Sequence, residues 1–137
     1  MIKTNKLMLG NYVQYLMEND IVSKPVKVNA IFNEYVEVTN GEVLYDLEEL
    51  EMIGVIIDEE LLLDLGFSLL YDDNNVKYYM HKDKLVWAQF IKSAQRYDIA
   101  STSSDSTIYN IKDLHQLQNA YFILTGKHLN INLIENE

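Results

Sequence analysis

Cysteine is absent from this sequence of 137 residues, and proline and arginine each occur once. Without cysteine the chain has no disulfide framework, no thiolate zinc site, no iron–sulfur cluster and no cysteine nucleophile. One proline and 48% hydrophobic residues are unlike the composition of a disordered chain, so we expect a folded core. At this length we predict one compact unit over residues 1–137, with a β lobe at residues 1–57 and an α+β lobe at residues 58–137.

Long apolar runs are also absent. No run approaches the roughly 20 apolar residues that cross a bilayer, and the N-terminal stretch has no apolar core followed by a small-residue cleavage site. We therefore expect a cytoplasmic protein that makes no membrane contact.

Motifs for catalysis and for metal binding are missing as well. The five glycines stand apart, which excludes the phosphate-binding loop and the dinucleotide-binding fingerprint. His81, His115 and His128 lie too far apart in sequence to form a helical metal-binding pair. The serines gather in one polar stretch, with no G-x-S-x-G turn to hold a nucleophile. We expect no enzyme, no metal and no cofactor.

Positive charge is missing from the middle of the chain. Residues 28–76 contain no lysine or arginine but thirteen acids, while the whole chain carries a formal net charge of −10. Because nucleic-acid binding needs basic residues that neutralise phosphates, we expect no direct binding to DNA or RNA. The acids either keep the protein soluble or form a face that meets a basic partner protein. The candidate interface residues are Glu42, Asp46, Glu48, Glu49, Glu51, Glu59 and Glu60.

The first half of the sequence alternates apolar and polar residues, as short strands do. This pattern predicts strands over Asn11–Tyr15, Pro25–Phe32, Glu34–Thr39 and Glu42–Leu47. Asn40 and Gly41 accept positive φ readily, so they predict a type I′ hairpin turn. Strands this short bury no face alone, and we expect them to close into a small SH3-like β-barrel or a bent meander.

A short linking helix is predicted next. Asp58 is a good N-cap, Glu59 and Glu60 favour a helix N-terminus, and Gly66 suits a left-handed C-terminal cap. Beyond it, a three-stranded antiparallel sheet is predicted over Phe67–Tyr71, Val76–His81 and Leu85–Ile91.

The last third of the chain combines a polar stretch with the clearest helix. Ile99–Thr107 is rich in serine and predicts a mobile surface loop. From Asn110, a predicted N-cap, apolar residues recur every three or four positions, which predicts a helix over residues 110–125 that packs on the sheet and ends at Gly126. Leu129–Leu133 alternates as a final strand. The fold class is therefore α+β.

Tyrosine is over-represented, with ten residues beside one tryptophan. Neighbouring Tyr78 and Tyr79 must point to opposite faces of their strand, so one of them is expected at the surface. Core packing accounts for many aromatic residues, but exposed rings also serve protein interfaces and base-stacking pockets. The candidates for binding a nucleotide-like ligand are Tyr78, Tyr79, Trp87, Arg96, His115, Gln118 and Asn119. Its phosphate would meet Lys77, Lys82, Lys84, Arg96 or Lys112.

Three segments, Leu7–Val13, Leu50–Phe67 and Leu114–Gly126, resemble a family of short uncharacterised proteins from Bacteroides-type bacteria, their prophages and their phages. The run L-H-Q-L-Q-N-x-Y-F-x-L-T-G at residues 114–126 is the most specific part of the resemblance. The resemblance implies a mobile-element setting, in the cytoplasm of the host cell, and no known activity. We expect a non-catalytic accessory protein that blocks a host defence protein through its acidic surface. Sequestration of a nucleotide-like signalling ligand and a virion or assembly role are the alternatives, and self-association stays open.

Overall fold

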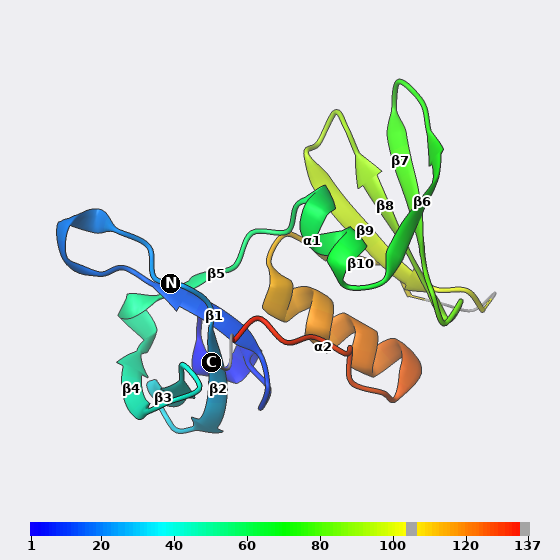
Figure 1. Ribbon diagram of the computed structural model, residues 1–137. Helices are drawn as coiled ribbons and strands as arrows, with labels where there is room; N and C mark the ends of the chain where they lie inside the picture. The colour runs from blue at the N-terminus through cyan, green and yellow to red at the C-terminus, as the bar shows by residue number, and fades with distance from the viewer. Residues whose placement is uncertain (104–106, 135–137) are drawn as a thin grey trace. The chain divides into compact units, whose positions relative to one another are not determined.

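The computed structural model describes residues 1–103 and 107–134. By its internal contacts the chain divides into unit 1, residues 1–55 with residues 131–134, and unit 2, residues 56–130. Each unit contains a five-stranded antiparallel sheet (Figure 1). The predicted α+β class is confirmed. A closed barrel is not observed, because the two edge strands of the sheet in unit 1 do not pair with each other among the described residues.

The sheet of unit 1 has the strand order β4-β3-β2-β1-β5. Its strands are β1 (Tyr12–Tyr15), β2 (Val26–Ile31), β3 (Tyr35–Thr39), β4 (Leu44–Glu48) and β5 (Met52–Gly54). Short 3-10 helices lie at η1 (Thr4–Lys6), η2 (Glu18–Asp20) and η3 (Glu49–Glu51). The four strands predicted here are confirmed, whereas β5 was not predicted individually. The alternate residues Val36, Val38 and Leu47 are buried, which places one face of the β3–β4 hairpin in the core.

The turn between β3 and β4 is not the predicted type I′ turn. Thr39 pairs with Leu44, so four residues form the loop, and of the predicted pair only Gly41 has positive φ, at +98°. The Asn40 side chain uses its Oδ1 to accept hydrogen bonds from the backbone N–H groups of Glu42 (2.9 Å) and Val43 (3.1 Å). This side-chain cap takes the place of the second left-handed residue that a type I′ turn requires.

Unit 2 is built on five consecutive strands, in the order β10-β9-β8-β7-β6. They are β6 (Phe67–Asp72), β7 (Val76–His81), β8 (Val86–Ile91), β9 (Arg96–Ser101) and β10 (Tyr109–Ile111). The predicted three-stranded sheet is therefore too small. The loop prediction is wrong for Ile99–Ser101, which complete β9, while residues 104–106 of that predicted loop lie outside the described residues.

Helix α1 (Glu59–Asp64) begins and ends as predicted. The Oδ1 atom of Asp58 accepts a hydrogen bond from the backbone N–H of Leu61 at 2.8 Å, and Gly66 follows the helix at φ +96°. Figure 1 shows α1 beside β6, on which it packs.

Helix α2 (Leu114–Thr125) begins later than predicted. Asn110 lies in β10 opposite Asp98, and Asp113 forms the N-terminal cap of the helix instead. Gly126 closes the helix at φ +73°. The segment Leu129–Leu133 forms no strand, so that prediction is wrong, and residues 131–134 belong to unit 1 rather than to the second lobe.

Helix α2 packs on β8, β9 and β10 (Figure 1). Tyr79, Ala88 and Ile99 are cross-strand neighbours and are fully buried, as is Leu117 of the helix. Tyr78, the neighbour of Tyr79, points to the other face and is half-buried, as the alternation predicts. Within the described residues, no helix is long and apolar enough to cross a membrane.

Candidate functional site

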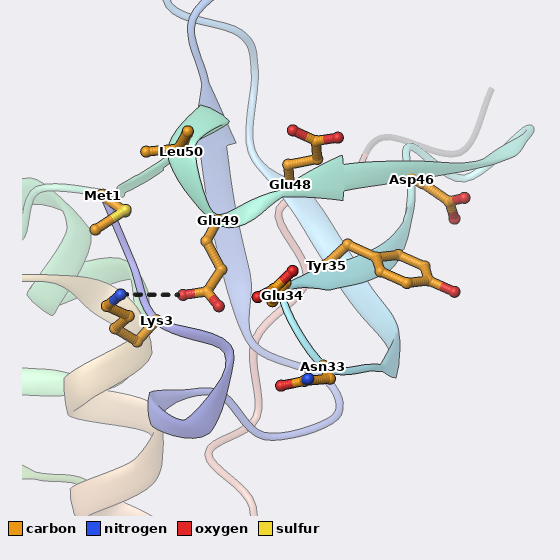
Figure 2. Close-up of a pocket in the computed structure, with 9 residues that line it drawn as sticks. All are labelled: Met1, Lys3, Asn33, Glu34, Tyr35, Asp46, Glu48, Glu49 and Leu50. Carbon is orange, nitrogen blue, oxygen red and sulfur yellow. Dashed lines mark ion pairs between the residues drawn. The ribbon is translucent and has the colours of Figure 1, made fainter.

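An acidic groove of about 740 Å³ lies on unit 1. It is lined by the N-terminal residues, the turn between β2 and β3, strand β4 and η3 (Figure 2). We call this surface the acidic groove. Its lining residues are Met1, Lys3, Asn33, Glu34, Tyr35, Asp46, Glu48, Glu49 and Leu50.

The acidic groove has a strong excess of negative charge. Four carboxylates, those of Glu34, Asp46, Glu48 and Glu49, line the groove with Met1 and Lys3, and in Figure 2 the Lys3 ammonium points to the Glu49 carboxylate while Asp46 and Glu48 point away from it. The Lys3 Nζ atom lies 3.8 Å from Glu49 Oε2, and the lysine side chain is 62% exposed. An ion pair this long and this exposed contributes little, about 0–1 kcal/mol. The groove is therefore incompletely neutralised by the part of the chain that the structure describes.

The register of β3 and β4 places like charges directly opposite each other. Tyr35 pairs with Glu48 and Glu37 with Asp46, while Val36 and Leu47 between them point into the core. Like charges directly opposite each other destabilise an antiparallel pair. The Nδ2 atom of Asn29 donates a hydrogen bond to Glu37 at 2.7 Å, which is a neutral partner rather than a counter-charge. The outer face of this hairpin thus carries a charge arrangement that does not favour folding.

The backbone around the acidic groove is fixed by hydrogen bonds. The backbone N–H of Glu49 donates to the carbonyl oxygen of Glu34 at 3.1 Å, which ties η3 to the turn between β2 and β3. Phe32 and Tyr35 flank that turn with stacked rings, 4.7 Å apart between centroids, and both are exposed. The backbones of Glu34 and Glu49 are therefore joined directly, beside an accessible aromatic pair.

The Glu49 carboxylate has one buried oxygen atom that accepts no hydrogen bond. Its Oε2 atom is buried without a hydrogen-bond partner, although the Lys3 ammonium lies 3.8 Å away. A buried charged acceptor without a donor is costly, so Glu49 also contributes to a charge arrangement that does not favour folding.

The predicted interface acids do not form one surface. Asp46, Glu48 and Glu49 line the acidic groove. Glu42 lies in the exposed loop between β3 and β4, and the Glu51 side chain accepts a hydrogen bond from the backbone N–H of Glu48 at 3.0 Å. The other two, Glu59 and Glu60, belong to helix α1 of unit 2.

Sequence reasoning did not assign Glu34, Tyr35 and Lys3 to the interface. Tyr35 and Glu37 alternate with the buried valines of β3, so the sequence does indicate that their side chains point outward. Their pairing with β4 depends on the length of the hairpin loop, which was predicted incorrectly. Nothing in the sequence indicates that Lys3 approaches Glu49.

A second cavity, which we call the aromatic cleft, lies on unit 2 and has a volume of about 360 Å³. Residues 56–58 and Glu59, the first residue of α1, line one part of it. Residues of β7 to β10, with the adjoining Gln95 and Lys112, line the rest. The lining includes three aromatic, three basic and two acidic residues: Tyr79, Phe90, Tyr97, Lys77, Arg96, Lys112, Asp58 and Glu59.

Glu59 is the centre of a polar network in the aromatic cleft. Its Oε2 atom accepts hydrogen bonds from the Tyr79 hydroxyl and from Lys77 Nζ, the latter at 3.2 Å. These two hydrogen bonds, that from Tyr79 first, lower the pKa of Glu59 below its usual value. Burial, together with the Glu59 carboxylate, raises the pKa of the Tyr79 phenol. Tyr79 is therefore a neutral donor that holds the carboxylate in place.

The predicted ligand-binding residues are divided among several places. Tyr79 and Arg96 line the aromatic cleft, together with Lys77 and Lys112 from the predicted phosphate-binding set. Tyr78 and Trp87 contact each other on the opposite face of the sheet, with ring centroids 5.8 Å apart.

The predicted ligand-binding residues of helix α2 do not line the aromatic cleft. His115 is buried, its Nδ1 atom has no hydrogen-bond partner, and burial lowers its pKa. Gln118 and Asn119 are half-buried and already have interaction partners. Lys82 and Lys84 lie in the turn between β7 and β8 and do not line the aromatic cleft.

No group of three or more histidine or acidic side chains that could hold a metal ion occurs within residues 1–103 and 107–134. In comparisons with known proteins, no family model, no curated protein and no solved structure matches this chain.

Proposed function

We propose that this protein is a non-catalytic binding protein whose acidic groove takes up a basic segment of a partner protein. The observation that carries the proposal is the concentration of four carboxylates, with one distant lysine, in a single groove on a fixed backbone. Solubility alone requires dispersed surface charge, and does not require carboxylates that share one concave surface.

The chemistry of the groove favours lysine or arginine side chains as its occupants. Each cation would relieve repulsion between neighbouring carboxylates, and its N–H groups would donate hydrogen bonds to their exposed oxygens. The long-range field of a chain with net charge −10 would speed the encounter with a basic partner.

Apolar contacts are available beside the carboxylates. Tyr35 is 37% exposed and stacks on Phe32, so it presents a ring to a guanidinium or an ammonium group. Leu50 is 80% exposed at the edge of the groove, where it could contact the aliphatic stem of a bound lysine or arginine. The groove thus combines charge recognition with apolar surface, as protein interfaces do.

The resemblance to proteins of phages and prophages supports a host protein as the partner. On a basic protein surface that binds nucleic acid, rows of carboxylates can take the positions that phosphates would occupy. The proposed role is therefore to block a host defence protein by covering its basic surface.

The test compares two variants of equal charge. The groove variant carries Glu34→Gln, Glu48→Gln and Glu49→Gln. The control variant carries Glu18→Gln, Asp20→Asn and Asp64→Asn, three exposed acids outside the groove. Both variants have a formal net charge of −7 instead of −10. The probe is a labelled peptide of lysine, arginine and glycine, and fluorescence anisotropy measures its binding.

We expect the groove variant alone to lose affinity. Three exposed ion pairs at about 0.2–1 kcal/mol each amount to a loss of about 3-fold to about 100-fold. If both variants weaken binding equally, the peptide responds only to net charge and the groove is not a binding site. If neither variant weakens it, the acidic surface does not bind basic segments at all.

A further inference from the structure

The aromatic cleft of unit 2 carries an inference that is independent of the acidic groove. Within the cleft, Lys77 pairs with Phe90, and Phe90 pairs with Tyr97. Tyr97 pairs in turn with Ile111. Directly paired residues of an antiparallel sheet point to the same face, so these side chains share the face of the buried Tyr79. The cavity on this face has a volume of about 360 Å³, within the range of small-molecule sites, about 300–1,000 Å³.

Two of the basic residues that line the cleft do not supply positive charge to it. Arg96 and Lys112 are the sequence neighbours of Tyr97 and Ile111, so alternation turns their side chains to the opposite face of the sheet. The Nε atom of Arg96 lies 3.3 Å from the carboxylate of Asp98, which alternates to that opposite face as well. Of the described basic residues in the lining, only Lys77 therefore points to the same face as Tyr97.

The cleft has one more carboxylate than it has ammonium groups. The Tyr79 hydroxyl and Lys77 Nζ both donate to Glu59 Oε2, the latter at 3.2 Å, and they lower the pKa of Glu59, which keeps it ionised. Asp58 accepts a hydrogen bond from the backbone N–H of Leu61, but it forms no ion pair in the described part of the chain. The uncompensated charge of the cleft is negative, so the cleft favours a cation.

Three oxygen atoms of the cleft are available as acceptors. Glu59 Oε1, Asp58 Oδ2 and the Tyr97 hydroxyl form no hydrogen bond with any residue that the structure describes. Burial first, and then the negative charges of Asp58 and Glu59, raise the pKa of the Tyr97 phenol. An electrostatic effect of this kind requires both carboxylates to lie near that hydroxyl. A protonated primary amine has three N–H donors, one for each of these oxygens.

Phe90 supplies apolar surface in the same cleft. It is half-buried, and its ring packs on Tyr97 with the ring centroids 4.8 Å apart. The face of an aromatic ring attracts a cation, and the ring also packs against an apolar body. Ile56, which is 69% exposed, lines the cleft as well. The cleft therefore combines recognition of positive charge with apolar contacts.

We propose that the aromatic cleft binds a small primary ammonium compound with an apolar body. The ammonium group donates hydrogen bonds to Asp58, Glu59 and the Tyr97 hydroxyl, and the apolar body contacts Phe90. A primary ammonium group suits these acceptors better than a quaternary one, because a quaternary nitrogen has no N–H group to donate. The net charge of −10 acts in the same direction, since it attracts cations to the protein.

Isothermal titration calorimetry of the full chain with phenethylamine, which is protonated near neutral pH, tests the proposal. Three comparison compounds each lack one recognised feature. Phenethyl alcohol has no charge, the trimethylated derivative of phenethylamine has no N–H donor, and ethylamine has no aromatic ring. Each should bind at least about tenfold more weakly than phenethylamine, a difference of about 1.4 kcal/mol.

Two variants of equal charge test the site. Asp58→Asn removes a carboxylate of the cleft, and it should fold because asparagine also caps a helix well. We expect it to bind phenethylamine at least about fivefold more weakly, since a charged acceptor is lost. The matched control is Asp64→Asn, at an exposed acid at the other end of α1 and outside the cleft. The control should bind phenethylamine as the unmodified protein does.

Several results would overturn the proposal. Equal weakening in the two variants would show that the amine responds only to net charge. The absence of heat at millimolar phenethylamine would show that the cleft does not bind such a compound. Equal affinity for any of the three comparison compounds would show that the feature it lacks is not recognised.

Discussion

Asp83 connects the turn between β7 and β8 to helix α2, and its neutralisation should destabilise unit 2 measurably. Its carboxylate accepts hydrogen bonds from the Tyr121 hydroxyl and from the backbone N–H of Leu85 (2.9 Å). The same carboxylate lies 2.9 Å from Nδ1 of the buried His81, whose Nε2 faces the carbonyl oxygen of Leu65 at 3.1 Å. Asp83→Asn keeps the shape of the side chain and removes its charge.

The expected loss follows from the strength of hydrogen bonds to a charged group. One such bond contributes about 1.5–3 kcal/mol, so Asp83→Asn should lower the free energy of unfolding by that amount. At about 4 °C per kcal/mol for a chain of this length, Tm should fall by roughly 6–12 °C. Trp87 is the single tryptophan and lies in β8, so its fluorescence during urea unfolding reports on the same unit.

The pH dependence gives a sharper test. Burial alone raises the pKa of Asp83, but the hydrogen bonds from Tyr121, Leu85 and His81 outweigh burial and hold the pKa below its usual value. The stabilisation is therefore fully present above the unfolded pKa of about 4 and is lost as the pH falls through the lower pKa of the folded state. The gap between the unmodified protein and Asp83→Asn should therefore begin to narrow as the pH falls below about 4. A gap that stays constant from pH 7 to pH 3, or no gap at all, would refute this reasoning.

Three further predictions concern the backbone, the core and a buried imidazole. Gly66→Ala should cost more than Gly126→Ala in urea unfolding, because both have positive φ but only the first would place a Cβ atom 3.1 Å from a side-chain carbon. The shared backbone cost is about 1–2 kcal/mol. Leu117→Ala should cost about 2–5 kcal/mol, whereas Ile123→Ala, at a residue 62% exposed, should change the free energy of unfolding by less than about 0.5 kcal/mol. Burial lowers the pKa of His115, so stability should fall as the pH drops below about 6.5, and His115→Gln should reduce that fall when unfolding is measured at pH 7.5 and 5.5.

Local signals in the sequence predicted the helices better than the sheets. The cap at Asp58 and the glycines at 66 and 126 depend on interactions within a few residues, and the structure confirms them. Asn110 looked like an N-cap, but pairing with Asp98 of β9 draws it into a strand. Pairing with a distant strand outweighed the preference of asparagine for the N-cap position. No signal within the helix sequence could have indicated this pairing.

The strands that the sequence did not predict are either short or adjoin a polar stretch. Met52–Gly54 has three residues, too few to show alternation, and becomes a strand only because β1 pairs with it. In Arg96–Ser101, Tyr97 and Ile99 do alternate with polar neighbours, but the serines that follow masked the pattern. The final segment alternates without forming a strand; its described part in unit 1 includes the carbonyl oxygen of Ile131, which accepts a hydrogen bond from the Tyr12 hydroxyl at 3.4 Å.

The candidate site depended on pairing more than on composition. The acidic middle of the chain was evident from the sequence, and it includes Asp46, Glu48 and Glu49 of the groove. The register of β3 and β4 then brings Tyr35 opposite Glu48, and the backbone contact from Glu49 brings Glu34 to the same groove. These contacts depend on the four-residue loop between β3 and β4, whose length was predicted incorrectly from the sequence.

The most direct test of the proposed function is a nuclear magnetic resonance titration of the isotope-labelled full chain with the basic peptide. The account predicts that amide shifts concentrate at residues 33–35 and 46–50, which border the acidic groove. It also predicts that the amide resonances of Glu18, Asp20 and Glu60, which are equally acidic and exposed, show no chemical-shift change. Shifts of equal size at all exposed acids, or shifts confined to acids outside the groove, would contradict the account.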